Sequence, residues 1–129
     1  MMKYFVVDVF TSELFHGNPA GVCLLDSWPD DMVLQNIAAE NNLSETAFLV
    51  KNDGYYDLRW FTPELEIDLC GHATMGSAFV LFEYMEHNAD TLRFSTQSGV
   101  LKVTKVKDML LMDFPARPGQ PAPNYPSLS

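Results

Sequence analysis

The sequence has few cysteines and few basic residues, and these two shortages exclude several classes of protein. Its only cysteines, Cys23 and Cys70, form neither a Cys-x-x-Cys motif nor the ligand spacing of a structural zinc site, so we expect no metal. Lysine and arginine number 8 against 17 acidic residues, which gives a net charge of −9. A surface this negative repels phosphate backbones and anionic lipids, so we expect no binding to nucleic acid or to a membrane.

The sequence also lacks a long apolar segment. The longest uncharged run, Leu69–Phe82, is too short to span a bilayer and contains polar residues. The apolar stretch near the N-terminus is too short for a signal peptide and contains Asp8. We therefore expect a cytoplasmic protein with reduced thiols.

What the sequence does contain is typical of one globular domain. Its 129 residues are 47% hydrophobic and 19% charged, which allows a core without disulfides. We expect this domain to span residues 1–115. The segment that follows is rich in proline, and we expect residues 116–129 to be a linker or tail toward a second domain that the chain lacks.

Hydrophobic periodicity predicts two helices and several short strands. One helix opens at residues 28–31 and ends near 41–42. The other spans 72–87 and is uncharged over its first eleven residues, so we expect it to be buried nearly all round. The expected strands are 3–10, 20–25, 45–50, 55–62, 91–96, 100–106 and 109–114, with 66–69 as a further short candidate and a loop over 11–19. We expect an α+β fold in which a curved, mostly antiparallel sheet wraps around the second helix.

One candidate for chemistry is Glu45, in the segment Asn42–Phe48, where a helical pattern gives way to a strand pattern. A carboxyl group in a poorly solvated site suits general acid–base catalysis. The plainer interpretation is a solvent-exposed glutamate at the start of a strand, which is common.

A second candidate is the start of the uncharged helix, at Gly71 and His72. A helix N-terminus presents unpaired N–H groups and partial positive charge, which bind carboxylates. Gly71 allows a ligand to approach the backbone, and His72 can donate a hydrogen bond or carry a proton. Cys70 directly precedes the helix and could be the base of a cysteine-type racemase, although such a cysteine is more often a small buried residue.

Several motifs, taken in their order along nearly the whole chain, resemble the phenazine biosynthesis-like (PhzF) family. They are Asp8-Val9-Phe10-Thr11, Gly17-Asn18-Pro19-Ala20, Asn42–Phe48, Arg59-Trp60-Phe61-Thr62-Pro63, Asp68-Leu69-Cys70-Gly71-His72-Ala73-Thr74, Ser98-Gly99 and Met112–Pro118.

This resemblance implies a fold similar to that of diaminopimelate epimerase, with two pseudo-symmetric domains and an active site between them. It implies an isomerase that moves a proton on a small carboxylic acid without a cofactor. The family's acid–base glutamate matches Glu45, and its active-site glycine and histidine match Gly71 and His72. Ser44 and Asn18, which lie in the matching motifs, are further candidates for substrate contact.

The family's members are about twice as long as this chain, so two alternatives stay open. The chain could be a catalytically inactive half-domain that binds a small ligand or a partner, or it could belong to a cysteine-type epimerase that uses Cys70. We expect it to form a homodimer or to pair with a second domain. The predicted contact surface contains Phe48, Phe61, Leu69 and Cys70.

Overall fold

The structure is a computed structural model, which describes residues 2–10, 17–68, 70–107 and 109–113. Its elements, in chain order, are β1 (Lys3–Phe10), β2 (Gly17–Leu25), α1 (Asp31–Asn41), β3 (Glu45–Lys51), β4 (Tyr56–Phe61), β5 (Glu66–Ile67), α2 (Gly71–Tyr84), β6 (Thr91–Thr96), β7 (Gly99–Val106) and β8 (Met109–Asp113). None of the described helices is long and apolar enough to cross a membrane.

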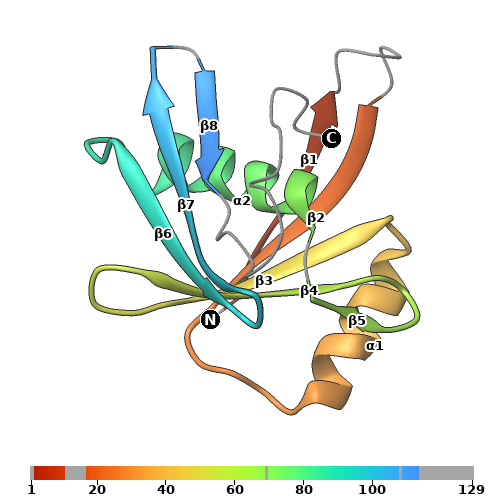
Figure 1. Cartoon of the computed structure of the whole chain (residues 1–129). Helices are drawn as coiled ribbons and strands as arrows, with labels where there is room; N and C mark the ends of the chain where they lie inside the picture. Colours follow the sequence, from red (N-terminus) through yellow and green to blue (C-terminus); the bar gives the residue numbers. More distant parts are fainter. Residues whose placement is uncertain (1, 11–16, 69, 108, 114–129) are drawn as a thin grey trace, which may run out of the picture.

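All the strands belong to one sheet, which curls around α2 (Figure 1). The order is β1-β2-β3-β4-β6-β7-β8, and β5 pairs with β4. The pairs β2–β3 and β4–β6 are parallel, and the other pairs are antiparallel. One edge of β4 is shared, because β6 pairs with it at Tyr56 and Asp57 and β5 pairs with it at Trp60 and Phe61. The predicted α+β fold with a mostly antiparallel curved sheet is confirmed.

The inner face of the sheet and α2 form the main core. Residues two apart along a strand point to the same face, and the inner face takes alternate apolar residues from each strand. From β2, β3 and β4 these are Ala20, Val22, Leu24, Ala47, Leu49, Tyr56, Leu58 and Trp60. Because α2 packs inside this curl, it is apolar on nearly every side, and its most exposed apolar residue before Tyr84 is Phe79, at 47%.

The outer face of the sheet carries a second, smaller core beneath α1. Cys23, Phe48 and Phe61 point outward from the sheet and pack against Leu34 and Ala38 of the helix. The predicted contact surface for self-association is therefore wrong. Phe48 and Phe61 are 0% and 2% exposed, because α1 covers them, and Cys70 is 8% exposed.

One prediction differs from the structure near the start of β2. Gly17, Asn18 and Pro19 were expected in a loop over 11–19, but they belong to β2 and pair with β1. Residues 11–16 lie outside the described residues. Leu69 and the expected linker at 116–129 lie outside the described residues.

Candidate active site

Glu45 is the first residue of β3, and the end of α1 places it there. The helix ends when Asn42 takes a left-handed conformation, with φ of 53°, and donates its N–H to the carbonyl of Ala38. The chain then enters β3, where Glu45 pairs with Ala20 of the parallel strand β2. Glu45 has the same alternation as the buried Ala47, so its side chain points to the inner face of the sheet, toward α2.

The first turn of α2 brings Cys70 and His72 to the same place. Cys70 is the N-cap residue and has an extended backbone, and α2 begins at Gly71. The side chain of Cys70 makes no capping hydrogen bond to the helix, and the first turn contains no acidic residue. The N–H groups and partial positive charge of the helix start therefore face a site that already holds a carboxylate, that of Glu45.

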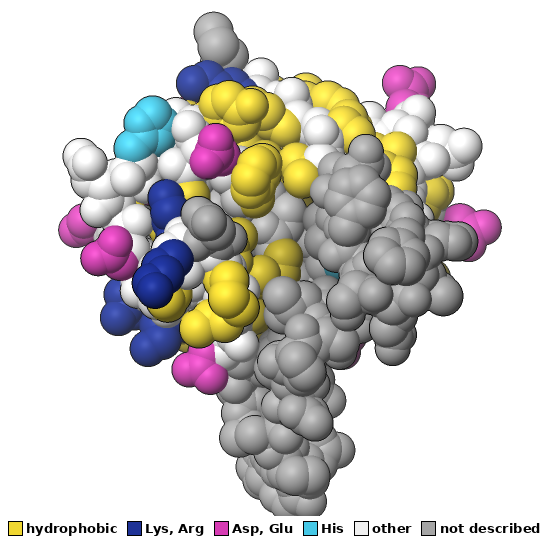
Figure 2. Space-filling view, turned by 90° about the horizontal axis from the view of Figure 1, so that it is seen from above, with side chains coloured by type: hydrophobic (Ala, Val, Ile, Leu, Met, Phe, Trp, Pro, Cys, Tyr) yellow, Lys and Arg dark blue, Asp and Glu magenta, His cyan; other side chains and the backbone are white. Residues whose placement is uncertain are grey.

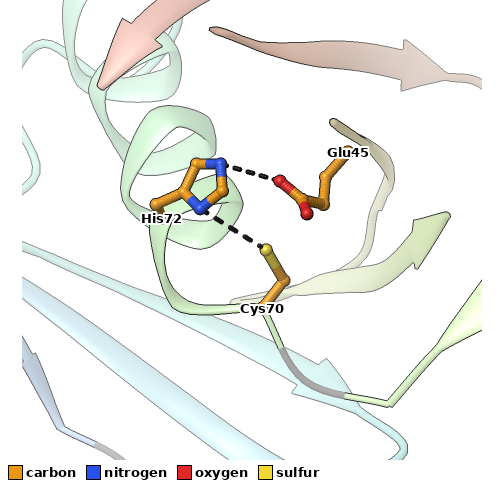
Figure 3. Close-up of side chains that lie close together, drawn as sticks. All are labelled: Glu45, Cys70 and His72. Carbon is orange, nitrogen blue, oxygen red and sulfur yellow. Dashed lines mark hydrogen bonds and ion pairs between the residues drawn. The ribbon is translucent and has the colours of Figure 1, made fainter. Parts of the chain in front are cut away.

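The imidazole of His72 lies between the carboxylate and the thiol (Figure 3). Its Nε2 is 2.8 Å from Oε1 of Glu45, and its Nδ1 is 3.9 Å from Sγ of Cys70. The side chains of His72 and Glu45 are only 12% and 19% exposed. The 2.8 Å contact is short enough for an ion pair, but within the described part of the chain neither atom has a hydrogen bond of regular geometry. The attraction between Glu45 and His72 is therefore mainly electrostatic.

His72 holds its proton strongly in this setting. The contact with Cys70, and then that with Glu45, raises the pKa of His72 to about 10, although burial alone would lower it. The positive end of α2 also opposes a charge on His72, so the imidazolium depends on these two neighbours. At neutral pH His72 is therefore an imidazolium beside Glu45.

The same three side chains could offer ligands to a metal ion. One atom each from Glu45, Cys70 and His72 lies within 4.8 Å of the others. However, the two ring nitrogens of His72 face different partners, Glu45 on one side and Cys70 on the other (Figure 3). This arrangement suits the transfer of a proton along the row better than the convergence of three ligands on one ion.

Comparison with known proteins identifies the family to which the chain belongs. The model of the family described as "Phenazine biosynthesis-like protein" matches residues 7–129. The chain belongs to the phenazine biosynthesis-like family. The relationship that the sequence motifs suggested is confirmed.

Several known proteins are similar to this chain in sequence or in fold. An uncharacterized isomerase of Pseudomonas aeruginosa is 56% identical over 120 residues, which are 93% of this chain and 46% of that protein. A crystal structure of a PhzC/PhzF protein from Clostridium difficile is 52% identical and has a TM-score of 0.81, over 89% of this chain and 44% of that one. A predicted epimerase of Pseudomonas aeruginosa is 26% identical, with a TM-score of 0.66, over 88% and 43% of the two chains. The chain thus spans less than half the length of the relatives that it matches.

In this family member, the structure brings three of the five predicted site residues together. Glu45, Gly71 and His72 meet at the start of α2. Ser44 is exposed just before β3. Asn18 lies in β2 opposite Val9, and its side chain is outside the described structure. The roles of all five residues stay predictions.

Sequence reasoning missed two features of the site. One is the contact between Cys70 and His72, which a Cys-x-His spacing before a helix could have suggested. The other is a buried chain of hydrogen bonds from Trp60 through Thr74 to the carbonyl of Cys70. That chain joins β4 to α2, and nothing in the local sequence indicates which indole meets which hydroxyl.

Proposed function

We propose that this chain is the N-terminal part of a cofactor-independent isomerase that moves a proton on a small amino or hydroxy carboxylic acid. Glu45 is the general acid and base, and the start of α2 binds the substrate's carboxylate. The rest of the protein, which makes up more than half the length of the relatives, supplies the other side of the site.

The observation that supports this proposal best is the 2.8 Å contact between Glu45 and His72 at the start of α2. It brings the carboxyl group of Glu45 next to the imidazole of His72 at the positive end of α2, which is the arrangement that the proposed proton transfer needs. The names of relatives agree with the reaction class, since several are called isomerases.

The proposed reaction proceeds in two proton transfers. The substrate's carboxylate binds His72 and the N–H groups of the first turn of α2, and it displaces Glu45 from the imidazolium. The carboxylate of Glu45 then takes a proton from a carbon next to the unsaturated or carbonyl group. The resulting anion is stabilised by the imidazolium and the helix end. Glu45 returns the proton to a different carbon, so atoms and charge balance without a cofactor.

The test uses the whole protein and a panel of small unsaturated and amino acids in D2O, with mass spectrometry to detect deuterium uptake. Glu45→Gln keeps the shape of the side chain and removes the titrating group, so we expect exchange to fall by roughly 100- to 10,000-fold. Glu40→Gln is the matched control, because Glu40 is an exposed carboxylate on α1. Exchange by Glu45→Gln at the rate of the parent protein would refute the assignment.

A cysteine-type epimerase is the second candidate, and the 3.9 Å contact between Cys70 and His72 favours it. One of the similar structures is also named a predicted epimerase. In that case Cys70 would take the α-hydrogen of an amino or hydroxy acid, and Cys70→Ser would abolish exchange at the α-carbon. If Glu45 is the proton carrier, Cys70→Ser retains most of the exchange and Glu45→Gln loses it.

A further inference from the structure

We propose that Trp60 and Thr74 act as a positioning pair, which sets where the first turn of α2 stands and thereby holds His72 against Glu45. The inference rests on the proposed function for its purpose, although the geometry behind it does not. Neither residue touches the candidate substrate site.

The hydrogen bonds of this pair have a fixed direction. The indole nitrogen of Trp60 can only donate, and it donates to the hydroxyl oxygen of Thr74 over 3.0 Å. The hydroxyl of Thr74 must then use its own hydrogen elsewhere, and it donates to the carbonyl of Cys70 over 2.7 Å. That carbonyl also accepts the N–H of Thr74, over 3.2 Å. The indole is thus linked, through the hydroxyl of Thr74, to Cys70, the N-cap residue of α2.

This link lies in a core that is otherwise mainly apolar and makes few directional contacts with α2. The helix otherwise packs mainly through apolar side chains, whose burial is a non-directional source of stability. Trp60 and Thr74 are 1% and 0% exposed, so breaking their bond would leave a donor buried without water. A buried polar contact of this kind favours a single position of the helix.

The pair also joins the strands that carry the site. Trp60 pairs with Ala47 of β3, two residues beyond Glu45, and with Ile67 of β5, three residues before Cys70. The hydrogen bond of its indole therefore helps to fix the distance between β3, which carries Glu45, and the first turn of α2, which carries His72. A shift of about 1 Å at such a site can cost roughly 100-fold in rate, so this distance matters for the chemistry.

The test is an NMR titration of the labelled histidines in the 129-residue chain, which needs no substrate. Thr74→Val keeps the shape of the side chain and removes the hydroxyl. We expect the pKa of His72 to move from about 10 toward 6.5 as its contacts with Cys70 and Glu45 loosen. Thr74→Ser retains the hydroxyl, and we expect it to keep the titration of the parent chain.

Ser77→Ala is the matched control within the same helix. Ser77 is also fully buried and donates to the carbonyl four residues earlier, Ala73, over 2.8 Å. No described hydrogen bond joins Ser77 to a strand. We expect Ser77→Ala to change the melting temperature without moving the titration of His72.

A double variant separates position from stability. Removing both partners, in Trp60→Phe with Thr74→Val, leaves no orphaned donor and should recover part of the melting temperature lost in Thr74→Val. We expect the pKa of His72 in this double variant to stay below that of the parent chain. Should Thr74→Val fail to fold, Trp60→Phe alone gives the same reading. If the pKa of His72 in these variants equals that of the parent chain, the proposal is wrong. It is also wrong if the pKa of His72 returns to the parent value when the double variant regains stability. In either case the pair would have a purely structural role. These results would be the same if Glu45 proved not to be the general acid and base, so the two proposals can fail separately.

Discussion

At the scale of single residues, His72 is the group whose state depends most on its surroundings. In the unfolded chain it titrates near 6.5, and in the folded chain contacts with Cys70 and Glu45 raise its pKa to about 10. A raised pKa means that the folded state binds the proton more tightly. The corresponding stability is complete below pH 6.5 and is lost as the pH rises toward 10.

We expect His72→Gln to remove this pH dependence. Each unit of pKa shift corresponds to about 1.4 kcal/mol, so the parent should lose roughly 1–4 kcal/mol more than the variant between pH 6 and pH 10. Urea unfolding at the two pH values measures the difference. Buried Cys23, whose pKa is raised to about 12, also lowers stability at high pH, but it does so in both proteins. Parallel stability curves for the parent and His72→Gln would show that the ion pair contributes nothing.

At the scale of elements, the sequence predicted the helices and strands whose hydrophobic pattern is contained in the element itself. Strands β4 and β7 alternate buried residues with more exposed ones, and α2 has no acidic residue before Glu83 because most of its length is enclosed. The start of β2 was missed because Gly17, Asn18 and Pro19 are turn-forming residues, and only pairing with β1 holds them in a strand. The parallel pairs could not be predicted, since each joins strands separated by a helix.

Contacts between residues that are distant in the sequence were also the part of the site that could not be predicted from local patterns. Glu45 and His72 lie 27 positions apart, and only resemblance to a family joined them before the structure did. Arg59 shows the opposite case. It donates two hydrogen bonds of 2.8 Å to Glu66, contacts Asp31 and lies against Trp28, so that it ties α1, β4 and β5 together. No local pattern marks Arg59, because its partners come from α1, from β5 and from the loop before α1.

The enclosure of α2 gives a prediction at this scale. Ala78 is fully buried, so Ala78→Asp would place an unpaired charge in the core and should cost several kcal/mol. Phe79→Asp is the comparison, because Phe79 is the neighbouring residue and is 47% exposed. We expect the melting temperature to fall far more for Ala78→Asp. Equal losses would contradict the enclosed position of this helix face.

At the scale of the whole molecule, the chain presents apolar surface that a longer protein or a second copy could cover. Hydrophobic side chains are exposed over the end of the molecule that Figure 2 shows. On the outer side of β7 and β8, Val106 pairs with Met109, and Leu111 follows two residues later. These three side chains are 45%, 62% and 49% exposed. Neighbouring exposed apolar groups of this kind favour association.

We therefore expect the 129-residue chain to self-associate through β7 and β8 instead of the buried surface around Phe48. Sedimentation velocity over a range of concentrations should show a dimer for the parent. Met109→Lys with Leu111→Lys should shift it toward a monomer. The net charge of −9 makes this test stringent, since added lysines reduce the repulsion between copies and would by themselves promote association. Met32→Lys, at a 73% exposed position on α1, is the control and should behave like the parent. A parent chain that stays monomeric at high concentration would contradict self-association through β7 and β8.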